Sequence, residues 1–203
     1  MPAPAKTATR QLLARPERRA AILEAAASAF VHEGFAATSM EDVAAAAGIT
    51  RLILYRHFAS KEALYEAVLD RVSSRLAEEY TGGITHGQLR GLGPRTLLTV
   101  AREDPDGFTL LWRHAARERQ FADHATRART HAVALARSVL HGRVADPTRE
   151  EWAAELVVSY LVDAVLHWLE VGGDPAQDDA IVETVTRAAR AMITVWSRPA
   201  SSP

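Results

Sequence analysis

Apolar residues recur every three or four positions along most of the chain, which is the spacing of one face of a helix. The first such segment begins at Pro16, a residue suited to the first turn of a helix, and Gly34 ends it. Runs in which apolar and polar residues alternate, as they do in strands, are missing from the sequence. The pattern predicts an all-α fold with glycine and proline at the helix ends.

Hydroxyl side chains that can cap a helix precede each of the next three expected helices. The first four helices are expected over 16–33, 39–46, 51–58 and 61–80, with Thr38 or Ser39, Thr50 and Ser60 as caps. Five glycines within residues 81–93 predict a flexible connector after them. Further helices are expected over 94–103, 106–119, 121–141, 149–171 and 178–196. Asp146 and Pro147, with a capping box of Thr148 and Glu151, mark the start of the helix that reaches residue 171.

Charge is distributed unevenly, although the net charge is only −1. Residues 1–20 carry five basic groups and one acid, residues 43–61 carry no acid, and acids accumulate further along the chain. This asymmetry is typical of a protein whose N-terminal part faces phosphate. The sequence has no cysteine, which excludes disulfides and thiolate metal sites. We expect no signal peptide, no membrane contact and a cytoplasmic location.

Three residues between positions 44 and 54 have the spacing of a helix-turn-helix. Ala44 is small where a second helix would cross the first, and Gly48 supplies a turn residue that tolerates positive φ. Leu54 supplies the apolar anchor of the second helix. An Ala-x-x-x-Gly fragment alone would be weak evidence, but all three positions together favour a DNA-reading unit.

The surrounding residues resemble a known family. The string AAGITRLILYRHFASKEAL, together with Phe35, Thr38 and Val43, is similar to the N-terminal domain of the tetracycline-repressor (TetR) family. The resemblance covers about residues 18–70, whereas residues 71–203 resemble the family only in length and helical layout. It implies a regulator that binds double-stranded DNA at a palindromic operator, acts as a homodimer and responds to an unknown small-molecule effector. Repression is the commoner activity of the family.

The resemblance implies three parts for this chain. A disordered basic arm covers residues 1–15, a helix-turn-helix DNA-binding domain covers 16–62, and a helical ligand-binding and dimerisation domain covers 63–200. We leave open whether the arm contacts DNA or is inert.

Candidate DNA contacts divide into two groups. Residues expected to hydrogen-bond phosphate, or to place a helix N-terminus against it, are Thr38, Thr50, Tyr55, His57 and Lys61. Residues in or beside the expected recognition helix are Arg51, Leu52, Ile53 and Arg56. Positions 52 and 53 are often small or hydroxylic in the family, so hydrogen-bonded base contacts are expected to rest on the two arginines. A core position for Tyr55 and a solvated position for Lys61 are the alternatives.

The helix over 149–171 is apolar on most sides, which indicates that neighbours enclose it. With the helix over 178–196 it would supply two helices per subunit to the intersubunit bundle that the family resemblance implies. The expected dimer contacts are Leu161, Val165, Trp168, Val185, Ala188 and Met192.

A ligand cavity among the central helices would use the aromatic residues there. The candidate ligand-binding residues are Phe108, Leu111, Trp112, His131, Tyr160, Asp163 and His167. Such apolar stripes are more often core than pocket. The polar stripe that contains Asp163 and His167 has three interpretations, namely a solvent-facing surface, a pocket wall and part of a metal site. Two ligands are too few for a metal site, so no metal and no cofactor are expected.

The mechanism expected from this layout is a population shift. Ligand binding would move the long helix that begins at Lys61 and so change the separation of two recognition helices. Two other classes remain as alternatives. One is a DNA-binding regulator without a small-molecule ligand, and the other is a small helical enzyme that uses Asp163 and His167. No catalytic motif is found in the sequence, so an enzyme is not expected.

Overall fold

The computed structural model describes residues 15–144 and 146–197, and these residues form helices without strands. The expected arm falls on residues 1–14, which lie outside the described residues, while Arg15 already belongs to the first helix. The elements are α1 (Arg15–Glu33), α2 (Met40–Ala46), α3 (Arg51–His57), α4 (Lys61–Thr85), α5 (Leu92–Glu103), α6 (Pro105–Thr109), a π-helical turn (Leu110–His114), a 3₁₀ turn (Ala115–Arg117), α7 (Ala122–Leu140), α8 (Pro147–Glu170), a 3₁₀ turn (Pro175–Gln177) and α9 (Asp178–Trp196). The all-α fold is confirmed.

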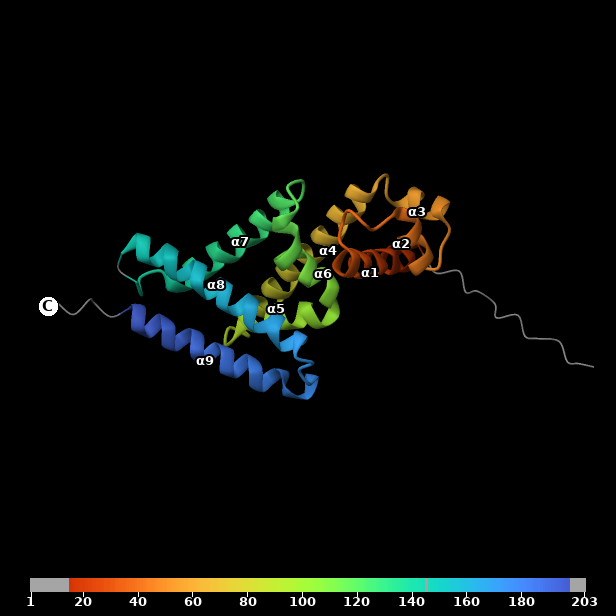
Figure 1. Ribbon diagram of the computed structural model, residues 1–203. Coiled ribbons are helices and arrows are strands. Elements are labelled where there is room, and N and C mark those ends of the chain that lie inside the picture. Colours follow the sequence, from red (N-terminus) through yellow and green to blue (C-terminus); the bar gives the residue numbers. More distant parts are fainter. Residues whose placement is uncertain (1–14, 145, 198–203) are drawn as a thin grey trace, which may run out of the picture.

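Helices α1–α3 form one end of the molecule and α7–α9 form the other (Figure 1). Helix α1 packs against α2 and α4, and its buried face supplies Ile22, Ala26 and Phe30 to the core. Phe30 lies against the ring of Tyr65 on α4, with 4.9 Å between ring centroids. The apolar residues of these three helices are closely packed, and this packing supports the position of α3.

Helix α4 connects the two ends of the molecule. It contacts α1 near its start and α5, α6 and α7 further along. The connector expected over 81–93 is shorter in the structure and covers residues 86–91, because α4 continues through Gly82 and Gly83 to Thr85 and α5 already begins at Leu92. A Cβ atom on Gly83 would lie 2.2 Å from a side-chain carbon of Leu92, so the glycine lets α5 approach α4 closely. The domain boundary expected after residue 62 falls within the first turn of α4.

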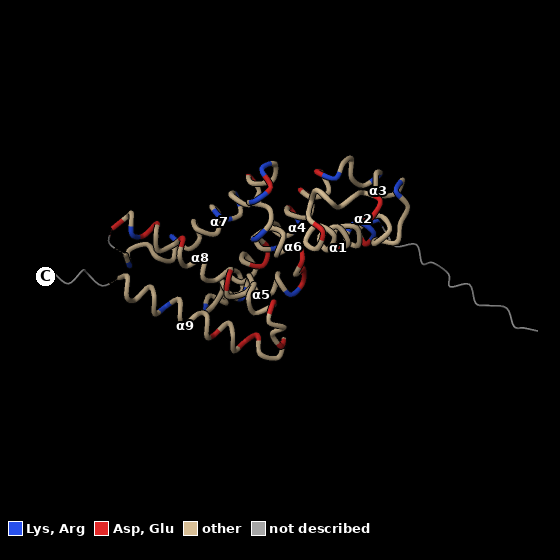
Figure 2. Tube along the Cα trace, in the orientation of Figure 1, with Lys and Arg blue, Asp and Glu red and all other residues tan. Residues whose placement is uncertain are grey.

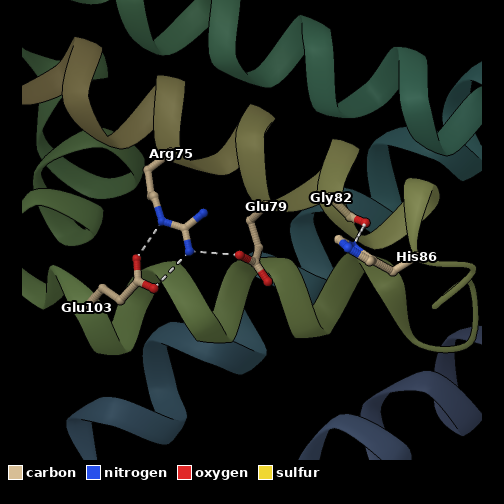
Figure 3. Close-up of polar contacts among 5 residues, drawn as sticks. All are labelled: Arg75, Glu79, Gly82, His86 and Glu103. Carbon is tan, nitrogen blue, oxygen red and sulfur yellow. Dashed lines mark hydrogen bonds and ion pairs between the residues drawn. The ribbon is translucent and has the colours of Figure 1, made fainter.

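An ionic cluster joins α4 to the end of α5 (Figure 3). Two guanidinium nitrogens of Arg75 form these bonds. Nε donates to one oxygen of Glu103 at 2.7 Å, and Nη2 donates to the other oxygen of Glu103 at 2.9 Å and to Glu79 at 2.7 Å. One turn earlier, Arg71 donates to Asp104 at 2.5 Å. These bonds fix α4 against α5 along its middle, so the two helices are positioned to move together.

The segment expected as one helix over 106–119 is divided into three pieces. A short α6 passes into the π-helical turn Leu110–His114 and then into a 3₁₀ turn. Phe108 and Leu111 are fully buried there and contribute to the central core. A π-helical turn widens the backbone by one residue and is often found at functional positions.

Helix α8 packs against α5, α7 and α9, as a helix that is apolar on most sides should. It is also long and apolar enough to cross a membrane by length and composition, with a mean hydropathy of 1.3 over its most apolar part. In this fold α5, α7 and α9 cover part of that apolar surface, and 39% of that part of the helix is buried. Asp146 caps α8 by accepting a hydrogen bond from the Arg149 N–H at 2.8 Å, as the sequence predicts.

Candidate DNA-binding site

The joint between α2 and α3 has the geometry that the sequence predicts. Ala44 is buried where the two helices meet, Gly48 has a φ of +65°, and Leu54 is fully buried. The Ile49 N–H donates to the Ala44 carbonyl at 2.9 Å, which closes the end of α2. Because α3 has only seven residues, it depends on this joint and on Leu54 for its position.

Side-chain caps define the start of both helices. Ser39 caps α2, and the reciprocal bond from its own N–H to Asp42 completes a capping box. Thr50 caps α3 by accepting from the Ile53 N–H at 3.4 Å. Of the two caps considered for α2, the structure therefore uses Ser39, and Thr50 has the role in α3 that the sequence predicts.

One face of α3 is open to solvent. Arg51, Leu52, Tyr55 and Arg56 are exposed, whereas Ile53 is half-buried. Exposed and buried positions alternate with helical periodicity around the anchor Leu54. Five of the residues expected at DNA, including Thr50 at the cap, are therefore presented on or beside one short helix.

Arg51 is held by two neighbours. Its guanidinium lies 2.5 Å from the carboxylate of Glu41 on α2 and over the ring of Tyr55, with 5.2 Å to the ring centroid. The hydrogen bond with Tyr55 and the charge of Glu41 raise the pKa of Arg51 above its ordinary value. The sequence interpretation missed Glu41. Its position two residues after the Ser39 cap, facing the start of the next helix, was the available signal.

The structure changes the interpretation of Thr38 and Lys61. Thr38 is 1% exposed, and its hydroxyl lies 2.8 Å from the Gly34 carbonyl, to which it donates. The ammonium group of Lys61 donates to the carbonyls of Phe35 at 2.7 Å, Thr38 at 2.9 Å and Ala36 at 3.4 Å. An ammonium group has three N–H bonds, so Lys61 is fully engaged within the protein.

Lys61 also lies over the ring of Phe35, 4.4 Å from its centroid. Together these contacts tie the loop before α2 to the start of α4. In this geometry the Lys61 ammonium and the Thr38 hydroxyl are hydrogen-bonded within the protein, which favours a structural role for both groups over the expected phosphate contacts.

His57 lies at the end of α3 beside the start of α1. Burial lowers the pKa of His57 below its ordinary value, and the charges of Arg15, Arg18 and Arg19 lower it further. The guanidinium of Arg19 lies over the ring of Phe58 at 4.9 Å. Figure 2 shows basic residues both on α3 and at the start of α1. The helix-turn-helix thus has a cationic edge formed by α1 and α3, in the two parts of the sequence where basic residues outnumber acids.

The expected ligand-binding residues differ widely in exposure and do not form one buried group. Phe108 and Leu111 are buried, Trp112 and Tyr160 are half-buried, and His131, Asp163 and His167 are exposed. The polar stripe of α8 is therefore a solvent-facing surface, where His167 lies 3.5 Å from Glu170. A hollow of about 400 Å³ lies at the turn between α4 and α5, and one of about 80 Å³ lies between α5 and α9; neither is lined by an expected ligand residue.

The expected dimer contacts are also revised. Val165 and Val185 are 2% and 7% exposed within the single chain, so they have almost no surface to offer a second copy. Leu161, Ala188 and Met192 are half-buried, and Trp168 donates its indole N–H to Asp178 at 2.9 Å. The large apolar side chains exposed on α8 and α9 are Trp152, Leu156 and Val195. Because α8 is apolar on most sides, its sequence does not indicate which side faces outward.

Comparison with known proteins agrees with this architecture. The model of the bacterial regulatory proteins of the tetR family matches residues 22–68. The HTH-type transcriptional activator FasR of Mycolicibacterium smegmatis is 32% identical over 185 residues, which cover 85% of this chain and 82% of FasR. The HTH-type transcriptional repressor KstR2 of Mycobacterium tuberculosis is 46% identical over 52 residues, which cover 26% of each chain.

Among solved structures, a TetR-like transcriptional regulator from Rhodococcus sp. RHA1 superimposes with a TM-score of 0.71 at 23% identity. The match covers 88% of this chain and 97% of that chain, and at this identity it shows the shared fold. The match to FasR extends through both halves of the chain, beyond the helix-turn-helix. The chain therefore belongs to the TetR family of bacterial regulatory proteins and is a DNA-binding transcriptional regulator.

Proposed function

We propose that α3 reads a specific operator in the major groove of double-stranded DNA. The observation that carries this proposal is the single open face of α3, with Arg51, Leu52, Tyr55 and Arg56 exposed around the buried anchor Leu54. Arginine side chains can pair with guanine edges, and a short helix fits the width of the groove. Tyr55 and His57, with the Thr50 end of α3, contact phosphates in this proposal and fix the register.

The proposed functional unit is a homodimer formed through α8 and α9. Trp152, 51% exposed on α8, lies against Trp196 of α9 with 5.2 Å between ring centroids, and Val195 beside it is 62% exposed. Exposed large apolar groups on two adjacent helices favour burial against a second copy. A two-fold dimer presents two copies of α3 and requires an operator with two inverted half-sites.

A small-molecule effector is proposed to enter between α4, the π-helical turn and α7, which contact one another. Each of the three elements has a buried polar atom without a hydrogen-bond partner among the described residues: the hydroxyl of Tyr65, the indole nitrogen of Trp112 and Nδ1 of His124. Unpaired buried polar atoms carry a desolvation cost that a ligand can offset. Because these elements are packed, the effector would select a more open conformation.

The proposed coupling runs through α4. This helix starts beside α3 and is fixed to α5 and α6 by Arg75 and Arg71, so opening the packing around Tyr65 shifts its start relative to the second subunit. Effector binding thereby favours a separation of the two α3 helices that fits the operator poorly. In this proposal the second half of the chain binds the effector, and Asp163 and His167 have no catalytic role. The protein acts on DNA in the cytoplasm.

Repression is the proposed direction of control, because it is the commoner activity of the family. Activation is the second candidate, favoured by the match to the activator FasR over most of the chain. The match to the repressor KstR2 covers only the DNA-binding segment, which does not decide the direction. Transcription in vitro from a promoter that carries the selected operator, with and without the protein, distinguishes the two.

The test is selection of bound duplexes from a random pool at moderate salt, followed by a screen for small molecules that release the selected duplex. We expect an enriched inverted repeat bound by a dimer, and a change of the preferred sequence in Arg51→Ala. Failure to enrich any duplex would overturn the proposed operator recognition. Small molecules that bind the protein without changing operator affinity would overturn the proposed effector mechanism alone.

A further inference from the structure

Leu52 is an exposed apolar side chain in the middle of the DNA-facing surface. It is 63% exposed, whereas the neighbouring Leu54 is fully buried. Residues 51, 52, 55 and 56 lie on one side of α3 because they are one and four positions apart on the helix. Leu52 is therefore flanked by Arg51 and Arg56 and by the ring of Tyr55, on a surface whose other members are polar or charged.

Leu52 has no group that can accept or donate a hydrogen bond. It can therefore gain free energy at a base edge only by removing apolar surface from water. In the major groove the only large apolar group on the bases is the C5-methyl of thymine; 5-methylcytosine presents the same group at the same position. Residues near the start of a recognition helix are those that reach base edges, and Leu52 is the second residue of α3.

We propose that Leu52 determines part of the operator sequence by contacting the C5-methyl group of a thymine in each half-site. The proposal rests on the assignment of α3 as the recognition helix. Leu52 is 63% exposed, so its side chain is free to enter the groove beside Arg51. Leu52 then distinguishes thymine from cytosine by one methyl group, while the arginines supply the hydrogen-bonded contacts.

The size of this preference follows from the area of one methyl group. Burying a group of that size corresponds to about a fourfold change in affinity, and a dimer that makes the contact twice gains about 15-fold. Contacts to phosphate cannot produce such a preference, because they are the same for every sequence.

The test replaces each thymine of the selected operator in turn by uracil, which removes only the methyl group. We expect affinity of the wild-type protein, measured by fluorescence anisotropy, to fall about fourfold at one position per half-site and to change little elsewhere. Placing 5-methylcytosine rather than cytosine opposite guanine at the same position should restore part of the lost affinity.

Variants of the protein then assign the effect to Leu52. In Leu52→Ala the ratio of the affinity for the thymine operator to the affinity for the uracil operator should approach one. In Leu89→Ala this ratio should stay at about four. Leu89 is a matched control, because it is 66% exposed in the turn between α4 and α5, away from α3. Leu52→Gln serves as a second variant, and circular dichroism checks that each protein is folded.

Each result is decisive. If no thymine responds to uracil, or if the response is unchanged in Leu52→Ala and Leu52→Gln, the methyl contact is overturned while operator recognition stands. If the wild-type protein enriches no duplex at all, the proposed recognition role of α3 fails, and the methyl contact fails with it.

Discussion

The carboxylate of Glu41 on α2 holds the guanidinium of Arg51 on α3 at 2.5 Å, and the ring of Tyr55 covers the same guanidinium. This contact links the two helices of the helix-turn-helix by their charges as well as by their packing. It also places a negative charge at the surface proposed to meet DNA. Arg51 must therefore exchange Glu41 for a base edge or a phosphate when the protein binds its operator.

Replacing Glu41 by Gln should strengthen binding to every duplex. The substitution removes a negative charge that repels phosphate and that competes for Arg51, so we expect affinity to rise about two- to fivefold at low salt and less at high salt. Anisotropy titrations over a range of salt concentrations measure this. Glu78→Gln is the control, because Glu78 is exposed on α4 away from α3. Weaker binding of Glu41→Gln would instead mean that Glu41 orients Arg51 for its contact.

Replacing Lys61 by Met should lower stability more than it changes the electrostatics of DNA binding. Its ammonium group donates to three backbone carbonyls, and their loss should reduce the free energy of unfolding by about 2–3 kcal/mol. Urea denaturation measures the loss, with the exposed Arg117→Met as the control. The salt dependence of binding should be unchanged in the folded variant. A fall of about one in the salt slope would restore Lys61 as a phosphate contact.

Local signals made the DNA-binding half predictable. A cap such as Thr50 and a turn glycine such as Gly48 act on the backbone within a few residues, so their effects can be read from the sequence. The role of Lys61 could not be read in this way, because its partners lie 23 to 26 residues earlier in the chain. Its position in the family pattern indicated importance without indicating whether the contact was to DNA or to the protein.

The structure of the second half was harder to predict from the sequence, because it depends more on tertiary contacts. Gly82 and Gly83 predict a break, yet both lie within α4, and Leu92 packs where a Cβ atom of residue 83 would otherwise lie. The outward side of α8 could not be predicted for a similar reason. Val165 and Trp152 are both apolar, and only the positions of α5, α7 and α9 decide that one is buried and the other exposed.

Protonation of His57 should make binding to DNA tighter as the pH falls toward 6. In the free protein burial and the nearby arginines lower its pKa, so the ring is neutral near pH 7. A phosphate beside the ring raises the pKa in the complex, so binding takes up a proton, and the gain is present below the raised pKa and lost above it. We expect about a two- to fivefold gain between pH 7.5 and 6.

Anisotropy titrations at several pH values test this with two variants. His57→Gln should remove the gain, whereas His141→Gln should keep it, because His141 is largely exposed at the end of α7. An equal pH response in wild type and His57→Gln would show that another group takes up the proton.

The junction of α5, α8 and α9 should respond to acid through Asp178. Its carboxylate accepts hydrogen bonds from Arg102 at 2.7 and 2.9 Å and from the Trp168 indole at 2.9 Å. The bonds from Arg102, followed by that from Trp168, lower the pKa of Asp178 below its ordinary value. A lowered pKa stabilises the fold above the unfolded-state pKa, and this stabilisation disappears as pH falls through the lowered value.

Asp178→Asn should therefore reduce the free energy of unfolding by about 1.5–3 kcal/mol at pH 7, with a difference from wild type that shrinks below about pH 4. Urea denaturation at pH 7, 5 and 3.5 measures both effects. Asp179→Asn is the matched control, because its side chain is 85% exposed in the next position and forms a surface ion pair with Arg95. Such a pair contributes about 0–1 kcal/mol. Equal losses in the two variants, or a loss in Asp178→Asn that persists unchanged at pH 3.5, would show that the charge of Asp178 does not hold this junction together.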